Sequence, residues 1–244
     1  MESIKILKIF YLDKSFIFFL LIIILCGLFN NFFVYFLLLI IHELGHTITG
    51  ILLGYKLDKI KIYPYGGITL FKFGYNTPLK KELLVLIMGP IFQTIAYLIM
   101  KQFINYDYLI LYHYTLLFFN LLPIYPLDGG KLLNIVFNYR FNYKLSFFLS
   151  FYISLILLIV LIGYSFIIKN INFNMILIIL LIKLIKIYKE FDIIYNNFLL
   201  ERYLYHYKFN DIKCINNGNS FYKDKSHIIK MIPEDKFLKD FFER

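Results

Sequence analysis

Long blocks of apolar residues alternate with short basic segments along most of this chain. Most blocks approach or exceed the ~20 residues that a helix needs to cross the hydrocarbon core of a bilayer. Their positions predict six membrane-spanning helices, at residues 15–30, 32–54, 82–104, 107–124, 145–168 and 173–190. The predicted fold class is therefore an all-α polytopic membrane protein.

One segment departs from this pattern. Residues 57–73 alternate between apolar and polar side chains around Tyr65, Gly66 and Gly67. This period of two indicates a short β-hairpin, and a surface loop is the alternative. An isolated hairpin is marginal in water, so we expect it to lie against the membrane or the helices. Its edge strand would suit an extended peptide, which makes Gly66 and Gly67 candidate substrate-binding residues.

Composition and charge support membrane insertion. The chain is 60% hydrophobic and carries a formal net charge of +10. Its basic residues are dispersed over the N-terminal segment, alternate connections and the tail, which argues against nucleic-acid binding. The positive-inside rule then predicts that both termini lie in the cytoplasm. Cys26 falls in the first predicted span and Cys214 in the tail, so no disulfide is expected between them.

The chain is expected to divide near residue 190. Residues 1–190 hold the six predicted spans, and residues 191–244 form a mixed, polar cytoplasmic tail. The N-terminal apolar stretch lacks a small-residue cleavage site, which indicates an uncleaved first span rather than a signal peptide.

Candidate chemistry lies inside the second apolar block. His42, Glu43 and His46 form an H-E-x-x-H motif, and residues four apart share one face of a helix. Two imidazoles at this spacing suit a tetrahedral zinc ion, with the carboxylate placed to act on water. The alternative, a pair of satisfied core histidines, is weaker because polar groups in hydrocarbon are costly and usually functional.

A catalytic zinc ion usually takes a third protein ligand, and Asp128 is the best candidate. It follows Pro123 and Pro126, which cannot both sit in an uninterrupted helix, so the end of the fourth span should be unwound. Irregular backbone at membrane depth must be buried in protein or line a wet cavity. The alternative is a solvated cytoplasmic turn. His113 is expected to pack or to support the site, whereas His206 and His227 are expected to be solvated.

Together, the His42–His46 motif and the segment from Asn120 to Gly130 resemble the site-2 proteases, a family of intramembrane zinc metalloproteases. The hairpin and the six spans resemble the sporulation members of that family. The resemblance implies one Zn²⁺ held by His42, His46 and Asp128, with Glu43 as general base and acid. It also implies that Asn120, Pro123 and Pro126 contact the substrate chain.

The resemblance further implies a membrane-associated protein substrate, the sporulation sigma-K precursor, and small membrane proteins as inhibitors. Two features depart from the family pattern. Gln93 stands where an asparagine is common, and we expect this exchange of amides to be tolerated. The tail resembles the opening of a nucleotide-binding CBS domain, which is expected to be incomplete.

Three other functions compete with this one. A zinc transporter would need more polar residues along a pathway or paired broken helices. An inactive scaffold would have no use for Glu43 beside the metal. A site-2 protease could also cut another membrane-anchored regulator, such as an anti-sigma factor, because the motif does not specify the substrate.

Overall fold

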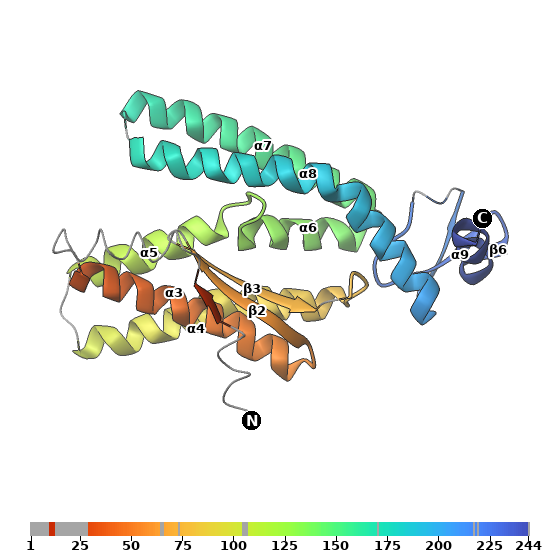
Figure 1. Ribbon diagram of the computed structural model, residues 1–244, viewed down its shortest axis with the longest axis horizontal. Coiled ribbons are helices and arrows are strands. Elements are labelled where there is room, and N and C mark those ends of the chain that lie inside the picture. The colour runs from red at the N-terminus through yellow and green to blue at the C-terminus, as the bar shows by residue number, and fades with distance from the viewer. Residues whose placement is uncertain are drawn as a thin grey trace. The chain divides into compact units, whose positions relative to one another are not determined.

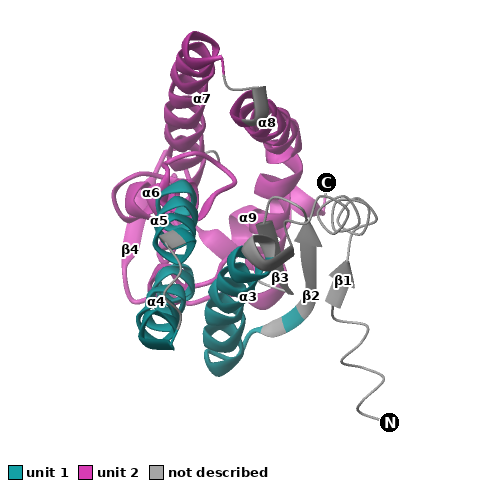
Figure 2. Ribbon diagram, turned by 90° about the vertical axis from the view of Figure 1, so that its left-hand side faces the viewer, with its two compact units in different colours: residues 1–73, 84–120 teal, residues 74–83, 121–244 magenta. Residues whose placement is uncertain are grey.

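The computed structural model describes residues 10–12, 29–63, 66–72, 74–103, 107–169, 171–216, 218 and 220–243 (Figure 1). These residues form mostly helices, with two small sheets. In chain order the elements are β1 (Phe10–Leu12), α3 (Phe29–Leu52), β2 (Lys56–Tyr63), β3 (Gly66–Lys72), α4 (Leu79–Phe103), α5 (Asp107–Leu121), α6 (Asp128–Arg140), α7 (Tyr143–Ile168), α8 (Ile171–Tyr205), β4 (Ile212–Ile215), β5 (Ser226–Ile229), β6 (Ile232–Pro233) and α9 (Glu234–Phe242). The chain divides into two compact units, residues 1–73 with 84–120 and residues 74–83 with 121–244 (Figure 2).

The first unit is built from α3, α5 and most of α4. Apolar side chains from all three helices form its core: Leu38, Leu39, Tyr97, Leu109 and Leu116. Helix α4 continues through Pro90, and the carbonyl of that residue accepts a hydrogen bond from Thr94 Oγ1 at 2.8 Å. The burial of one stripe on each helix leaves many large apolar side chains outside, as expected where lipid replaces water.

A three-stranded sheet belongs to the same unit. Strands β2 and β3 form an antiparallel hairpin, and β1 pairs with β2 in parallel. The strand order β1-β2-β3 leaves β3 at one edge of this sheet. Strand β3 also packs against α3. The predicted hairpin is therefore confirmed, and the structure adds a third strand to it.

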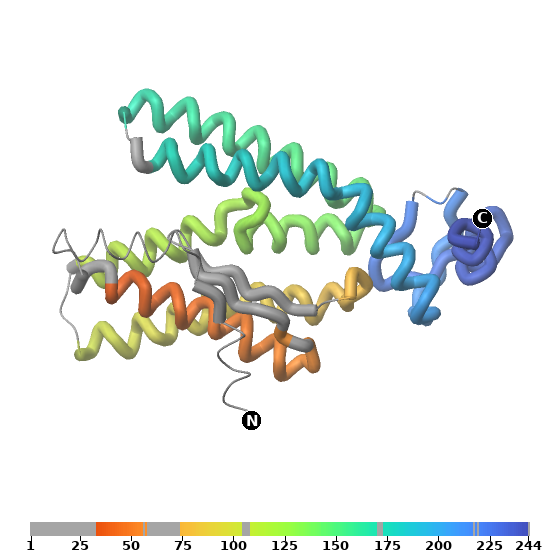
Figure 3. The backbone as a smooth tube through the Cα atoms, in the orientation of Figure 1, coloured from red at the N-terminus to blue at the C-terminus, as the bar shows by residue number. Residues whose placement is uncertain are grey.

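The second unit contains a long helical hairpin. Helices α7 and α8 lie side by side (Figure 3). Helix α7 is capped at its C-terminus by Lys169 in a left-handed conformation with φ 56°. Serines 146, 150 and 154 repeat every four residues on α7 and are fully buried. Each donates to the carbonyl four residues earlier, so each hydroxyl proton has an acceptor within α7. The small side chains form a narrow stripe that allows close packing.

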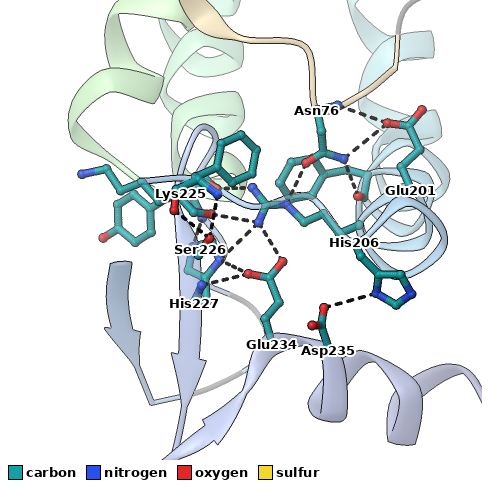
Figure 4. Close-up of polar contacts among 12 residues, drawn as sticks. Asn76, Glu201, His206, Lys225, Ser226, His227, Glu234 and Asp235 are labelled. Carbon is teal, nitrogen blue, oxygen red and sulfur yellow. Dashed lines mark hydrogen bonds and ion pairs between the residues drawn. The ribbon is translucent and has the colours of Figure 1, made fainter. Parts of the chain in front are cut away.

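The tail is joined to the end of α8 by a buried arginine. Arg202 is 1% exposed, and its Nη1 donates to Glu234 Oε1 at 2.8 Å. Its Nε donates to Asn76 Oδ1 at 2.7 Å and its Nη2 to the Tyr222 carbonyl at 2.8 Å. Asn76 also donates to Glu201, as Figure 4 shows. One side chain thus links α8 with residues 74–78 and with the tail.

His227 completes this cluster (Figure 4). The Tyr222 amide donates to its Nε2 at 2.9 Å, so the ring proton is on Nδ1, which faces Glu234 Oε2 at 2.9 Å. Burial lowers the pKa of His227 below its ordinary value. Burial raises the pKa of Glu234, but hydrogen bonding to His227 and the charge of Arg202 outweigh it and hold that pKa below its ordinary value. The expectation that His227 is solvated was wrong, since it is 2% exposed.

The helices compare with the predicted spans as follows. Within the part of the chain that the structure describes, three helices are long and apolar enough to cross a membrane: Phe33–Leu52, Leu79–Phe103 and Tyr143–Ile168. Helix α5 coincides with the span predicted at 107–124 but has 15 residues, and α8 extends beyond 173–190 to residue 205. Most of the span predicted at 15–30 lies outside the described residues. The count of six spans therefore stays a prediction.

Two features of the tail go beyond the sequence pattern, and the division near residue 190 stays a prediction. Helix α8 runs without a break through the boundary predicted at residue 190, because its apolar face continues to pack after its surface becomes charged. The tail also contains a second sheet of order β4-β5-β6, followed by α9, which the sequence pattern did not predict. Its strands have only four, four and two residues, too few to show a clear alternation.

Candidate metal centre

His42 and His46 lie on α3, four residues apart, as the motif predicts. Both are buried, with 1% and 6% of their surfaces exposed. Their Nε2 atoms are 3.1 Å apart, and the ring planes make an angle of 82°. Two ligands at about 2.0–2.1 Å from a tetrahedral zinc ion would be roughly 3.3 Å apart, close to this separation.

The other ring nitrogens determine which tautomers are present. His46 Nδ1 lies 2.8 Å from the Val85 carbonyl oxygen, which can only accept, so this nitrogen must donate. His42 Nδ1 lies 2.9 Å from Gln93 Oε1, again an acceptor. With protons on both Nδ1 atoms of the neutral rings, both Nε2 lone pairs are turned toward each other. A divalent cation satisfies such a pair, and outer partners of this kind orient metal ligands.

Two glycines allow α3 and α4 to approach at this point. A Cβ atom at Gly89 would lie 2.3 Å from the Nε2 and Cε1 atoms of His46. A Cβ atom at Gly45 would lie 2.5 Å from the Met88 carbonyl oxygen. Any larger residue would separate the helices or turn the His46 ring away. The close approach brings the Val85 carbonyl within reach of His46.

Glu43 lies between the histidines in sequence and is half-buried on α3. Its carbonyl oxygen accepts from Thr47 Oγ1 at 2.7 Å, which belongs to the ordinary helical pattern of threonine. The carboxylate is thus carried by the same helix as both imidazoles, one residue from His42.

Asp128 is the first residue of α6 and is 8% exposed. The preceding residues 122–127 are not helical, so the predicted break after the fourth span is confirmed. Here the Leu127 amide donates to the Ile124 carbonyl at 2.8 Å, and the Tyr125 amide donates to Ser154 Oγ at 2.9 Å. Lys131 Nζ lies 3.4 Å from Asp128 Oδ1.

The glycines after Asp128 are required by this turn. A Cβ atom at Gly129 would lie 2.1 Å from the Leu121 carbonyl oxygen, and one at Gly130 would lie 2.5 Å from the backbone of Ile124. Only residues without a side chain let the turn close on the end of α5. The sequence Asp-Gly-Gly therefore places a carboxylate at the start of a helix.

Among the described residues, one group could hold a metal ion. In the first unit it consists of His42 and His46, whose Nε2 atoms are 3.1 Å apart, and Asp128 of the second unit is the predicted third ligand. Two imidazole nitrogens and one carboxylate oxygen form a donor set that suits a catalytic zinc ion, with one position left for water. The residues present therefore fit the metal that the sequence predicts.

The predicted substrate-binding residues occupy other places. Asn120 is half-buried in the last turn of α5, and Pro123 and Pro126 lie in the irregular segment that follows. Gly66 and Gly67 begin β3 and pair with Tyr63 and Ile62. None of these five belongs to the group that could hold a metal, and their role as substrate contacts stays a prediction.

Sequence reasoning overlooked the residues that support the histidines. The partners Val85 and Gln93 come from α4, 39 and 51 residues from His46 and His42 respectively. The sequence singled out Gln93 as an amide where the family commonly has an asparagine, but no spacing rule connected it to His42.

Parts of this chain are similar to known proteins. The model of peptidase family M50 matches residues 30–106. Stage IV sporulation protein FB of Bacillus subtilis is 29% identical over 177 residues, which are 68% of this chain and 62% of that protein. A zinc metalloprotease of Methanocaldococcus jannaschii is 33% identical over 143 residues, 51% of this chain and 41% of that protein. The matches thus span less than two thirds of either curated relative.

A solved structure is also similar. The site-2 protease from Methanocaldococcus jannaschii aligns with a TM-score of 0.57 and 27% identity, over 72% of this chain and 89% of that chain. Residues 30–106 therefore match the family model of peptidase M50, and the chain is similar to proteins of the site-2 protease family, which are zinc metalloproteases. The apolar helices agree with an integral membrane protein.

Proposed function

We propose that this chain is an intramembrane zinc metalloendopeptidase that hydrolyses a peptide bond in a membrane-associated protein near the cytoplasmic face. One observation carries the proposal: the Nε2 atoms of His42 and His46 converge to 3.1 Å on the apolar helix that also carries Glu43. Metal ligands and a carboxylate inside such a helix have a clear use in hydrolysis, where the carboxylate acts on water.

One zinc ion is held by His42, His46 and Asp128 in this proposal. When bound, zinc acts as a Lewis acid and lowers the pKa of water. Gln93 and the Val85 carbonyl keep the two imidazoles in the tautomers that present Nε2 lone pairs. Burial of both histidines and Asp128 keeps bulk water away from the ligand atoms.

Glu43 is the general base and then the general acid. Its carboxylate takes a proton from the attacking water as the water oxygen bonds to the substrate carbonyl carbon. The same proton passes to the amide nitrogen as the carbon–nitrogen bond breaks, so the products are a carboxylic acid and an amine. Glutamine at this position could neither take nor return the proton.

The substrate must be extended before it is cut, because a helix keeps its carbonyls in hydrogen bonds. Strand β3 is an edge strand of its sheet among the described strands and packs against α3, the helix that carries the motif. A substrate segment that pairs with β3 would be extended close to that helix. Gly66 and Gly67 begin this strand, and Asn120, Pro123 and Pro126 are the further contacts that we propose.

The substrate that we propose is the precursor of the sporulation sigma factor K, with small membrane proteins as inhibitors. The similarity to a stage IV sporulation protein supports this choice. Another membrane-anchored regulator, such as an anti-sigma factor, is the alternative substrate. The six-span topology with both termini in the cytoplasm, in a bacterial membrane, belongs to the same proposal and is supported by the distribution of lysine and arginine.

Co-expression with the sigma-K precursor tests this function. Wild type, Glu43→Gln and the control Glu190→Gln would be compared by the size of the precursor on a gel, with zinc measured in each purified protein. Glu190 is a half-exposed carboxylate on α8, 3.8 Å from Lys186, so its replacement should change nothing.

We expect a shorter product with wild type and with the control, and an intact precursor with Glu43→Gln, which should retain zinc. Cleavage by Glu43→Gln would contradict its role as the base. An intact precursor with all three proteins would reject sigma-K as the substrate.

A further inference from the structure

Gln93 is a fully buried amide in an apolar unit, and it connects three helices. It lies on α4 and is 0% exposed. Its Oε1 is 2.9 Å from His42 Nδ1 on α3, and its Nε2 is 3.0 Å from the His113 carbonyl oxygen on α5. A buried polar side chain normally persists because its hydrogen bonds are used.

The orientation of this amide follows from its partners. The His113 carbonyl can only accept, so the nitrogen end of Gln93 must face it. His113 Nδ1, 3.2 Å from the same nitrogen, is then a second acceptor. The oxygen end is consequently directed at His42, whose Nδ1 must donate. His42 therefore presents an unprotonated Nε2, the form that binds a metal.

His113, whose carbonyl holds the nitrogen end of Gln93, is itself held in place. His113 is 2% exposed, and its ring stacks on Tyr97 with centroids 4.2 Å apart and planes 5° apart. The acceptor on the α5 backbone cannot be removed by a side-chain change, and neither can the Val85 carbonyl that holds His46. The bond from His42 to Gln93 is thus a contact on the histidine pair that a single substitution can delete cleanly.

We propose that Gln93 is a positioning residue for the metal centre, which holds the tautomer and ring orientation of His42 by a hydrogen bond anchored at His113. This inference rests on the proposed function. Loss of the acceptor would free the ring to rotate and to place its proton on Nε2, which blocks the metal. Outer-shell partners of this kind change metal affinity or activity by about 10–100-fold.

The test measures metal affinity directly, with the full chain in detergent micelles. Co²⁺ is the probe, because its visible absorption reports ligand number and geometry, and competition with a chelator gives the affinity for Zn²⁺. Gln93→Leu and Gln93→Met both remove the acceptor while filling the space with different shapes. Thr94→Val is the matched control, since Thr94 bonds to Pro90 within α4.

We expect Gln93→Leu and Gln93→Met to bind Zn²⁺ about 10–100-fold more weakly and to show an altered Co²⁺ spectrum. Thr94→Val should stay close to wild type. In cleavage assays with saturating Zn²⁺, kcat should fall for the apolar variants. KM should stay unchanged, because Gln93 is fully buried and does not contact the substrate.

The outcomes separate the two proposals. If wild type binds neither Co²⁺ nor Zn²⁺, the proposed function fails and this inference fails with it. If wild type binds both metals and the folded apolar variants bind them equally well, Gln93 has no positioning role. Two apolar variants of different shape are included so that the misfolding of one leaves the comparison intact.

Discussion

Replacing Gly89 with alanine should disturb the metal centre by an amount that the structure defines. The new Cβ atom would lie 2.3 Å from His46 Nε2, whereas ordinary van der Waals contact begins at 3.4 Å. The imidazole or the helix must therefore move by roughly 1 Å, at a cost of about 1–3 kcal/mol for overpacking. His46 cannot yield freely, because its Nδ1 is hydrogen-bonded to the Val85 carbonyl.

A displacement of this size is large for a metal ligand. Ligand distances in working sites lie within about 0.2 Å of their ideal values. We expect Gly89→Ala to lose most of its zinc and its cleavage rate to fall by about 100-fold, the typical effect of a 1 Å misplacement. Zinc would be measured by elemental analysis of the purified protein, and cleavage by product on a gel.

Gly163→Ala is the matched control. Gly163 lies in α7, and nothing is within 4 Å of the position that its Cβ would occupy. The same exchange there should leave zinc and cleavage unchanged and raise stability by about 0.4–1 kcal/mol, because alanine restricts the unfolded chain. Full zinc occupancy and a wild-type rate in Gly89→Ala would refute the packing of His46 against Gly89.

Three further predictions concern Asp128 and the tail. Asp128→Ala should lower zinc content and cleavage together; retention of both would remove Asp128 from the ligand set. Arg202→Met should destabilise the docked tail by about 3–5 kcal/mol, because it leaves Glu234 buried without its main cation. Limited proteolysis would detect this as faster cutting after residue 205, and an unchanged rate would contradict the role of Arg202. Docking of the tail should also weaken in acid. The folded pKa values of His227 and Glu234 are both depressed, so the unfolded tail binds more protons. The contribution of these two groups to the stability of the docked tail is then fully present above about pH 6.5. Below that pH the contribution is lost progressively, first through protonation of His227 and then, below about pH 4.3, through protonation of Glu234. Proteolysis of the tail at pH 7.5 and 5.5 measures this, and His227→Gln should reduce the difference.

The sequence could predict those parts of the site that depend on local geometry. The i, i+4 spacing of His42 and His46 places two imidazoles on one helical face whatever surrounds them. Pro123 and Pro126 end α5 because proline removes a backbone donor and clashes with the preceding turn. The alternation around Gly66 identified the hairpin for a similar reason, since strand pairing across a short turn involves neighbours in sequence.

Other features of the site depend on contacts between distant residues, and the sequence could not specify them. Gln93 and the Val85 carbonyl select the tautomers of the histidines, and Gly89 makes room for His46, but all three come from α4. His227 looked like a solvated histidine in a polar tail, and its burial depends on Arg202 and Glu234. Hydrophobic periodicity contains no record of which polar groups meet in the interior.

By itself, then, the sequence determined the chemistry that is available: two imidazoles and a carboxylate on an apolar helix, and an aspartate after a helix break. Only the tertiary structure decided how these groups are positioned and which ring nitrogens carry protons. It set the 3.1 Å separation of the two Nε2 atoms, the protonation of each Nδ1 and the continuity of α8 with the tail. The physical reason is that spacing along one helix is fixed by the backbone, whereas tautomers, burial and close helix packing depend on partners that only folding brings together.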